Sequence, residues 1–210
     1  MSAIFERIGL IIKHRDLLMR LVLKELKVRY KHPLLGFLWV LVVPVFMIFI
    51  FKLIFSTILK IQIEHYPFFV FLMTALFPWN YFQMSIFSTV MSILEARDLI
   101  KKVYFPREII PISIVLVNFV LFMLAFILVI FILPFFNVRF DKFIFLLPLV
   151  IFLQTLLIIG MSFIVSSLQV YYRDIKYITE ISLLGLFYLT PIFYPLQFIA
   201  NISDKFLSIY

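Results

Sequence analysis

The sequence predicts an all-α, polytopic membrane protein, and three observations support this fold class. Apolar residues make up 65% of the 210 residues, only 14% are charged, and the mean hydropathy is +1.15. A water-soluble domain could not bury that much apolar surface, so the lipid bilayer has to be its solvent. The apolar residues form long continuous runs, which favours helices over the alternating strands of a barrel. The charged residues lie mainly between these runs.

Five apolar runs are the predicted membrane spans, because roughly 20 apolar residues are needed to cross a bilayer. They cover residues 34–59, 66–94, 109–136, 143–170 and 181–200. Residues 201–210 are again partly apolar, and we expect a sixth span beyond them. The sequence thus predicts an N-terminal segment over residues 1–33, followed by a transmembrane domain over residues 34–210.

The basic residues are distributed unequally between the segments that join the spans. Fourteen Lys and Arg residues lie in the N-terminal segment and in the loops 95–108 and 171–180, whereas five lie in the other connections and near the last residues. Cytoplasmic loops carry an excess of Lys and Arg. This asymmetry predicts that the N-terminus and these two loops face the cytoplasm.

Residues 15–31 predict an amphipathic helix that lies in the plane of the membrane interface. At about 100° per residue, apolar side chains spread over one side of this helix and basic ones form a stripe on the other. Glu25 and Arg29 lie on the apolar side, where we expect them to pair with each other or with a neighbouring chain. The simpler alternative is a positively charged flank of the first span. The basic stripe consists of Arg20, Lys24, Lys27 and Lys31.

The sequence excludes several ways of powering a transporter. Its four glycines form no phosphate-binding loop, its three histidines are far apart, and it has no cysteine. The apolar runs contain no Asp, Glu, His or Arg, and Lys52 is close enough to the end of its run for its amine to reach the interface. We therefore expect no cofactor or metal in this chain, and either a pore-forming subunit that another protein drives or a passive membrane protein.

The loop 95–108 combines charged and apolar residues. Water alone would penalise the apolar ones, so they favour a protein partner, although a positively charged tether is the simpler alternative. Pro106 is expected to end the helix of this loop close to the third span. The charged residues are Arg97, Asp98, Lys101, Lys102, Arg107 and Glu108, and the apolar ones are Leu99, Ile100, Val103, Tyr104 and Phe105.

Two short motifs flank the last run. In YRDIK, residues 172–176, the charged Arg173, Asp174 and Lys176 either cap helices and bind headgroups, or contact a partner or form a gate at the cytoplasmic mouth. In TPIFYP, residues 190–195, Pro191 and Pro195 argue against a straight helix over 181–200, because proline removes a backbone donor.

The aromatic content is high, with 28 Phe and 10 Tyr. Most of these rings are expected to face lipid or the protein core, and some to form interfacial belts. A minority could line a conduit, and the candidates are Phe37, Trp39, Trp79, Tyr81, Phe82, Phe187, Tyr188 and Phe193. Amides in the runs could hydrogen-bond a substrate or form contacts between helices, and they are Asn80, Gln83, Asn118, Gln154 and Gln169.

Over nearly its whole length the chain resembles the permease subunit of ABC exporters for bacterial surface polysaccharides: O-antigen, capsule and teichoic acid. Four segments carry the resemblance: RDLLMRLVLKELKVRYKHPLLGFLW (15–39), FPWNYF (77–82), LIKKVYFPREIIPIS (99–113) and YYRDIKYITE…LFYLTPIFYP (171–195). The resemblance implies six spans after an interfacial helix, with re-entrant helices near the external face around Pro191 and Pro195 that gate the exit. It also implies that the loop 95–108 is a coupling helix, which docks into an ATPase. With a polysaccharide as substrate, the aromatic candidates for the conduit would stack on sugar rings, and the amides would hydrogen-bond sugar hydroxyls.

The resemblance further implies an assembly. Two copies of the permease would form a channel in the bacterial inner membrane, and two cytosolic ATPase subunits carrying ATP and Mg would drive it. The substrate would be an undecaprenyl-linked polysaccharide, with no nucleic acid among the partners and no catalysis in this chain. Two alternatives stay open: an ABC exporter for drugs or other small molecules, and a lipid-linked sugar flippase or membrane enzyme that acts alone. The second would be favoured by charged residues within the membrane.

Overall fold

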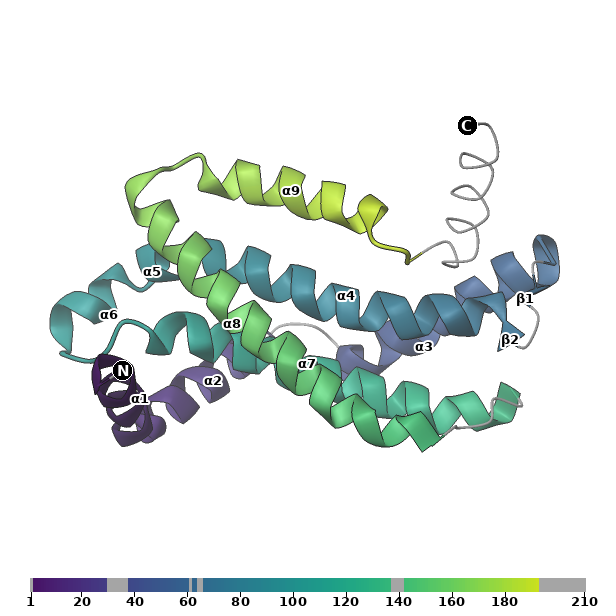
Figure 1. Ribbon diagram of the computed structural model, residues 1–210, viewed down its shortest axis with the longest axis horizontal. Helices are drawn as coiled ribbons and strands as arrows, with labels where there is room; N and C mark the ends of the chain where they lie inside the picture. The colour runs from purple at the N-terminus through teal and green to yellow at the C-terminus, as the bar shows by residue number, and fades with distance from the viewer. Residues whose placement is uncertain (1, 30–37, 61, 64–65, 137–141, 193–210) are drawn as a thin grey trace, which may run out of the picture.

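The computed structural model describes residues 2–29, 38–60, 62–63, 66–136 and 142–192. Within these ranges the regular elements are helices, apart from one antiparallel pair of two-residue strands, β1 (Gln62–Ile63) and β2 (Tyr66–Pro67), and short turns and loops join them. Helices satisfy their own backbone hydrogen bonds, as a lipid environment requires. The chain is therefore an all-α, polytopic membrane protein, in agreement with its composition (Figure 1).

The long helices pack around α4. It contacts α7, α8 and α9, and also the first span, in which α3 continues into a π-helix, η2. In the described part of the chain, three segments are long and apolar enough to cross a membrane, Leu41–Ile58, Ile109–Phe135 and Ile144–Tyr171. The bounds are α3 (Trp39–Phe51), η2 (Lys52–Ile58), α4 (Phe68–Val90), α7 (Ile109–Ile132), α8 (Leu147–Tyr171) and α9 (Ile175–Leu189).

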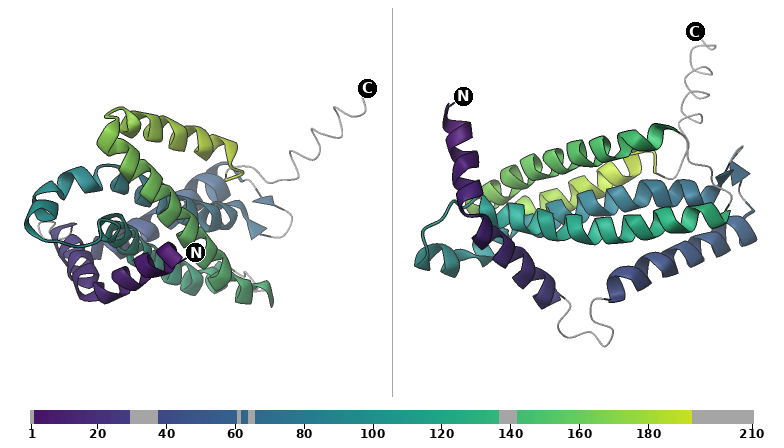
Figure 2. Two further views of the ribbon diagram at one scale, coloured as in Figure 1. Left: turned by 60° about the vertical axis from the view of Figure 1, so that its left-hand side comes forward. Right: turned by 90° about the horizontal axis from the view of Figure 1, so that it is seen from below.

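The connections gather at two opposite ends of the bundle (Figures 1 and 2). At one end, called here the α6 end, lie α1 (Ser2–Lys13), α5 (Ser92–Glu95), α6 (Arg97–Lys102) and the turn between α8 and α9. At the other, the β end, lie the strand pair and two 3-10 helices, η3 (Leu133–Phe136) and η4 (Lys142–Leu146). The N-terminal segment and the loops 95–108 and 171–180, which are rich in basic residues, thus meet at one end.

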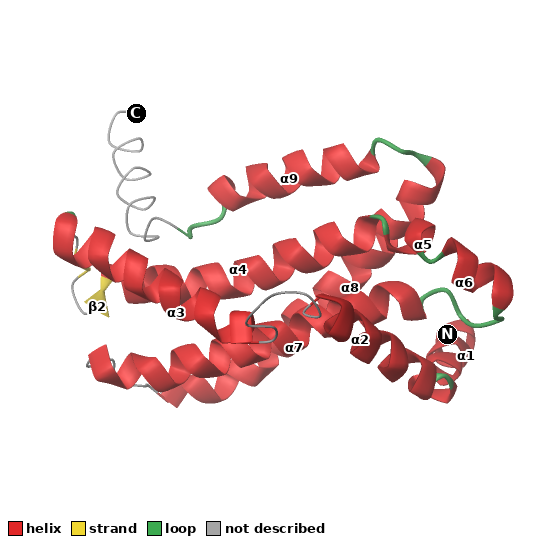
Figure 3. Ribbon diagram, turned by 180° about the vertical axis from the view of Figure 1, so that it is seen from behind, coloured by secondary structure: helices red, strands yellow, loops and turns green. Residues whose placement is uncertain are grey.

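The N-terminal segment forms two helices, α1 and α2 (Arg15–Arg29), which meet at His14. Nδ1 of His14 donates to the carbonyl oxygen of Leu10 at 2.8 Å. α2 runs obliquely across α7 and packs against it, with Val22 buried (Figure 3). The predicted helix over 15–31 is therefore described up to Arg29, and Lys31 lies outside the described residues.

The fifth apolar run differs most from its predicted bounds, 181–200. Its helix, α9, already begins at Ile175, so Lys176 belongs to the first turn of α9 and not to a loop. The helix ends at Leu189, and Thr190 is extended (φ −79°, ψ 135°) because the following Pro191 disfavours helical backbone before it. With 15 residues α9 is about 22 Å long, which is shorter than a bilayer core of about 30 Å.

Small and aromatic residues form the centre of the bundle. Ser85 of α4 and Ser162 and Ser166 of α8 are fully buried, and such small residues allow two membrane helices to approach closely. Next to them lies an apolar cluster whose residues come from four helices: Tyr81, Ile86, Val115, Phe122, Ile158 and Leu183. These contacts fix α4, α7, α8 and α9 relative to one another.

Candidate functional site

The connection between α5 and α7 is short and only partly helical. α6 ends at Lys102, since Val103 adopts extended backbone angles (φ −133°, ψ 134°). The prediction that Pro106 ends this helix is therefore wrong by four residues. The carbonyl oxygen of Pro106 instead accepts a hydrogen bond from the N–H of Ile109 at 3.2 Å, at the turn that leads into α7. The chain between Val103 and the start of α7 is therefore not part of α6.

One side of this loop is buried in the protein. Phe105 is 7% exposed and forms a cluster with Ile109 and Ile110 at the start of α7. Leu99 and Ile100 of α6 pack against the same cluster, and so do three residues of α2, Leu17, Leu18 and Leu21. We call this group the α2–α6–α7 cluster. This cluster joins α6 to α2 and to the start of α7.

The other side of the loop projects into solvent. Tyr104 is 100% exposed and Val103 is 48% exposed. The charged residues around them, Arg97, Asp98, Lys101, Lys102 and Arg107, are also exposed. The five apolar residues that the sequence assigned to one packing face therefore divide into two groups. Leu99, Ile100 and Phe105 face the protein, and Val103 and Tyr104 form an exposed tip.

The basic stripe of α2 faces outward, with Arg20, Lys24 and Lys27 exposed. Glu25 and Arg29 are only half-buried. Nη1 of Arg29 donates to Oδ1 of Asn118 on α7 at 2.9 Å. Sequence reasoning did not predict this partner, although an Asn amide in the apolar run 109–136 is a signal for a polar contact between helices.

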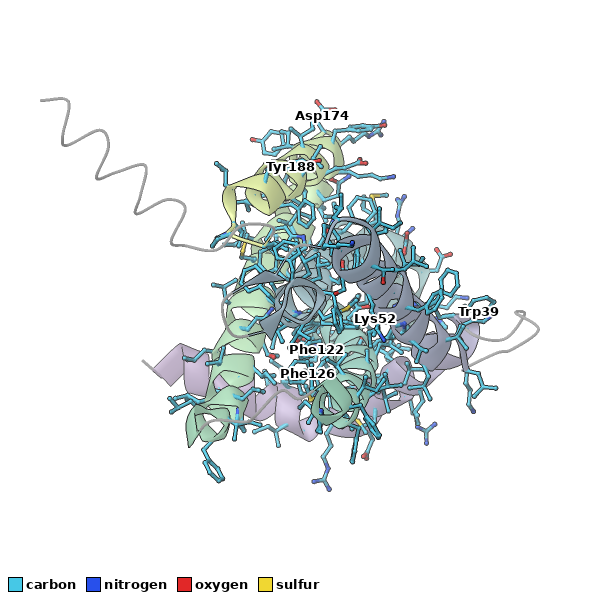
Figure 4. The ribbon with its side chains drawn as sticks, turned by 90° about the vertical axis from the view of Figure 1, so that its right-hand side faces the viewer. Trp39, Lys52, Phe122, Phe126, Asp174 and Tyr188 are labelled. Atoms are coloured by element: carbon cyan, nitrogen blue, oxygen red, sulfur yellow. The ribbon has the colours of Figure 1, made fainter. Side chains whose placement is uncertain are left out.

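A cavity of about 620 Å³ opens at the α6 end. It is lined by charged residues of both signs from α2, α5, α6 and α9: Lys24, Glu25, Arg29, Glu95, Asp98 and Lys176. The structure thus brings Lys176 of the YRDIK motif to the same cavity as residues of α2, α5 and α6. Arg173 and Asp174 lie at the exposed turn instead, where Asp174 points away from the bundle (Figure 4).

Four of the predicted sugar-stacking residues lie in one aromatic cluster, on α4 and α9. The ring of Trp79 lies 5.4 Å from that of Phe82 and 5.6 Å from that of Phe187, which in turn lies 5.5 Å from Tyr188. Trp79 is buried, whereas Tyr188 is exposed at the edge of the bundle (Figure 4). Tyr188 is therefore the member of this cluster with the most open ring face.

The remaining aromatic candidates lie elsewhere. Tyr81 is buried, stacks on Phe122 at 4.9 Å and donates from its hydroxyl to Oγ1 of Thr155 at 3.2 Å, so it has no free ring face. Trp39 is exposed at the start of α3, on the side of the bundle away from α9 (Figure 4). Phe37 and Phe193 lie outside the described residues, as does Pro195 of the predicted exit gate.

The polar residues in the apolar runs are engaged mainly with protein groups. Gln83 accepts a hydrogen bond from Nε1 of Trp79 at 3.1 Å. Nε2 of Gln154 on α8 donates to the carbonyl oxygen of Pro78 on α4 at 2.8 Å. Nε2 of Gln169 donates to the carbonyl oxygen of Arg173 at 3.2 Å. Of these three bonds, only that of Gln154 joins two helices, as the second predicted use requires, whereas those of Gln83 to Trp79 and of Gln169 to Arg173 are local. Asn80, by contrast, is exposed.

Comparison with known proteins identifies the class to which this arrangement belongs. The model of the ABC-2 type transporter family matches residues 16–208, and the chain belongs to this family of membrane-spanning transporter subunits. It is similar to the O-antigen export system permease protein RfbA of Myxococcus xanthus, with 31% identity over 197 residues, which cover 94% of this chain and 75% of the relative. Two proteins of the same name from Klebsiella pneumoniae are 34% and 32% identical over 187 residues, which cover 89% of this chain and 71% of each relative.

Proposed function

We propose that this chain is the channel-forming subunit of an ATP-driven exporter that moves lipid-linked polysaccharide across the bacterial cytoplasmic membrane. The three relatives are named as permeases of O-antigen export systems, which supports a surface glycan such as O-antigen, capsule or teichoic acid as cargo. The family supports a transport role, with ATP hydrolysis on a separate subunit. ATP and Mg would then bind to that subunit and not to this chain.

One observation supports the proposal most directly, the exposed tip formed by Val103 and Tyr104. A fully exposed Tyr next to a half-exposed Val suits a partner protein that covers both side chains. The tip is anchored through Phe105 to the α2–α6–α7 cluster. Binding of an ATPase at the tip would therefore move α6 together with α2 and the start of α7, so that nucleotide-driven motion reaches the membrane helices.

The proposal includes an assembly and an orientation. Two copies of this chain would pair to enclose a conduit, and two ATPase subunits would bind beneath them. The α6 end would face the cytoplasm, because the segments gathered there carry most of the basic residues. Lys176 and the other charges of the cavity at this end would then lie at the cytoplasmic mouth of the conduit.

The proposal is tested by deleting the gene for this chain in its own cell and measuring on which side of the membrane lipid-linked polysaccharide accumulates. We expect the glycan to remain on the cytoplasmic side and to return to the surface when the chain is supplied with its ATPase. The purified chain alone should hydrolyse no nucleotide, whereas the copurified complex should. A deletion that leaves surface glycan unchanged but sensitises the cell to drugs would support a small-molecule exporter instead. Export by the chain without an ATPase would support an independent flippase.

A further inference from the structure

One buried amide lies where two breaks between helices come together at the α6 end. Gln169 is in the last turn of α8 and is 3% exposed. The first break is Met91, the single residue between α4 and α5. The second is the turn 172–174 between α8 and α9, which contains Arg173. α5 packs against α8, and the turn lies at the same end of the bundle as α5 (Figure 1).

The amide bonds to both breaks through its nitrogen. Nε2 of Gln169 donates to the carbonyl oxygen of Arg173 at 3.2 Å and to Sδ of Met91 at 3.4 Å. An amide nitrogen carries two hydrogens, so each acceptor can receive its own. Met91 is 78 residues from Gln169 in the chain, so the second bond is a tertiary contact. The amide thus links the entry of α5 to the entry of α9.

The oxygen of the same amide is not used. Oε1 of Gln169 is buried and has no hydrogen-bond partner among the described residues. Exchanging the two ends of the amide would place this oxygen against a carbonyl oxygen and a thioether sulfur, neither of which can donate. A buried acceptor without a partner is costly, and an apolar side chain of similar size would avoid that cost. Stability alone therefore does not account for an amide at this position.

Each break leads into a segment that the proposed function uses. α5 continues through Ala96 into α6 and then to the tip formed by Val103 and Tyr104. The turn at Arg173 leads into α9, whose first turn contains Lys176, and this lysine lines the cavity at the α6 end. The amide therefore stands between the segment that contacts the ATPase and a helix of the membrane bundle.

We propose that Gln169 is a positioning residue that makes α9 follow the loop 95–108. A displacement of α5 and α6 is passed through Met91 to the amide, and from the amide to the backbone of Arg173 before α9. This route is separate from the α2–α6–α7 cluster, which consists of residues of α2, the loop 95–108 and α7. The role in transport rests on the proposed function, whereas the link between the two breaks is a property of this chain alone.

The link is tested by measuring the distance between α5 and α9. The chain has no cysteine, so spin labels at Leu94→Cys and Tyr177→Cys, two exposed positions, report this distance by pulsed EPR on the purified full chain. Gln169→Met is the test variant, because it keeps a flexible side chain of similar size and removes both the donors and the unused oxygen. Gln83→Met is the matched control for the distance, because Gln83 bonds to Trp79 within α4.

We expect one narrow distance population in the wild type and in Gln83→Met. In Gln169→Met a second population should gain about fivefold over its share in the wild type, as the loss of one neutral hydrogen bond predicts. The melting temperature should not fall, because the lost bonds are offset by the removal of an unpaired buried oxygen. The inference is overturned if the distances in Gln169→Met equal those of the wild type, or if Gln83→Met broadens them equally. It is also overturned if the melting temperature of Gln169→Met falls, since the amide would then only stabilise the fold.

A second measurement tests the role in transport. In the complex with the ATPase, Gln169→Met should keep copurification and ATP hydrolysis but lower the glycan exported per ATP about fivefold, because α6 would move without α9. Unchanged export per ATP would overturn this role, and so would an equal loss of hydrolysis and export. If the wild type neither copurifies with an ATPase nor exports glycan, the proposed function itself fails, and the distance measurement still decides whether Gln169 links the two breaks.

Discussion

The two sides of the loop between α5 and α7 have similar apolar residues and opposite surroundings. Leu99, Ile100 and Phe105 pack against α2 and α7, whereas Val103 and Tyr104 are exposed only one or two residues away from Phe105. The division follows from packing, because Phe105 is buried with Ile109 and Ile110 whereas Val103 and Tyr104 have no place in that cluster. The inward side is suited to holding the loop in place, and the outward side to contacting another protein. Substitutions on the two sides should therefore affect different measurements.

The largest expected effect is on folding and comes from the inward side. Phe105→Ala should lower the free energy of unfolding by about 3 kcal/mol, because it leaves a cavity in the α2–α6–α7 cluster. Unfolding in detergent, followed by circular dichroism, measures this change. Tyr104→Ala is the control and should change stability by less than about 0.5 kcal/mol, since the side chain is fully exposed. Equal losses for the two variants would refute the division of the loop.

The next effect is on assembly and comes from the outward side. Val103→Asp combined with Tyr104→Asp should weaken association with the ATPase about a hundredfold, because each carboxylate would be desolvated without a partner. Membrane insertion and stability should be unchanged. Copurification of the ATPase measures association, and Tyr104→Phe should retain it because the ring is kept.

An alternative docking surface can be checked in the same experiment. Tyr172→Asp changes an exposed aromatic residue at the turn between α8 and α9, also at the α6 end. If the double Asp variant copurifies normally and Tyr172→Asp does not, the ATPase docks at the YRDIK motif and the tip is only part of a tether.

The smallest effect concerns the charges around the tip. Lys101→Gln and Lys102→Gln should each weaken ATPase association only about twofold to threefold, because exposed charge pairs contribute about 0.2–1 kcal/mol. Their main effect should be on the association rate and its dependence on salt. Association rates at two salt concentrations measure this. A salt dependence identical to that of the wild type would mean that these lysines do not face the partner.

Much of the candidate site was predictable from local sequence. The position of the loop 95–108 follows from a basic segment between two apolar runs, and the end of α9 follows from Pro191. The division of the loop into two sides was not predictable, because the backbone angles at Val103 depend on how Phe105 packs against α2. The partner of Arg29 was not predictable either, since Asn118 is 89 residues away in the chain.

The sequence by itself determined that the chain is a helical membrane protein, because apolar composition and run length are properties of the chain alone. It also determined where the basic segments fall relative to the spans, and its motifs indicated the transporter family. Only the tertiary structure decided which side chains are exposed at the α6 end and that Arg29 of α2 meets Asn118 of α7. Burial and hydrogen bonding depend on distances between helices that are far apart in sequence, and no local pattern specifies those distances.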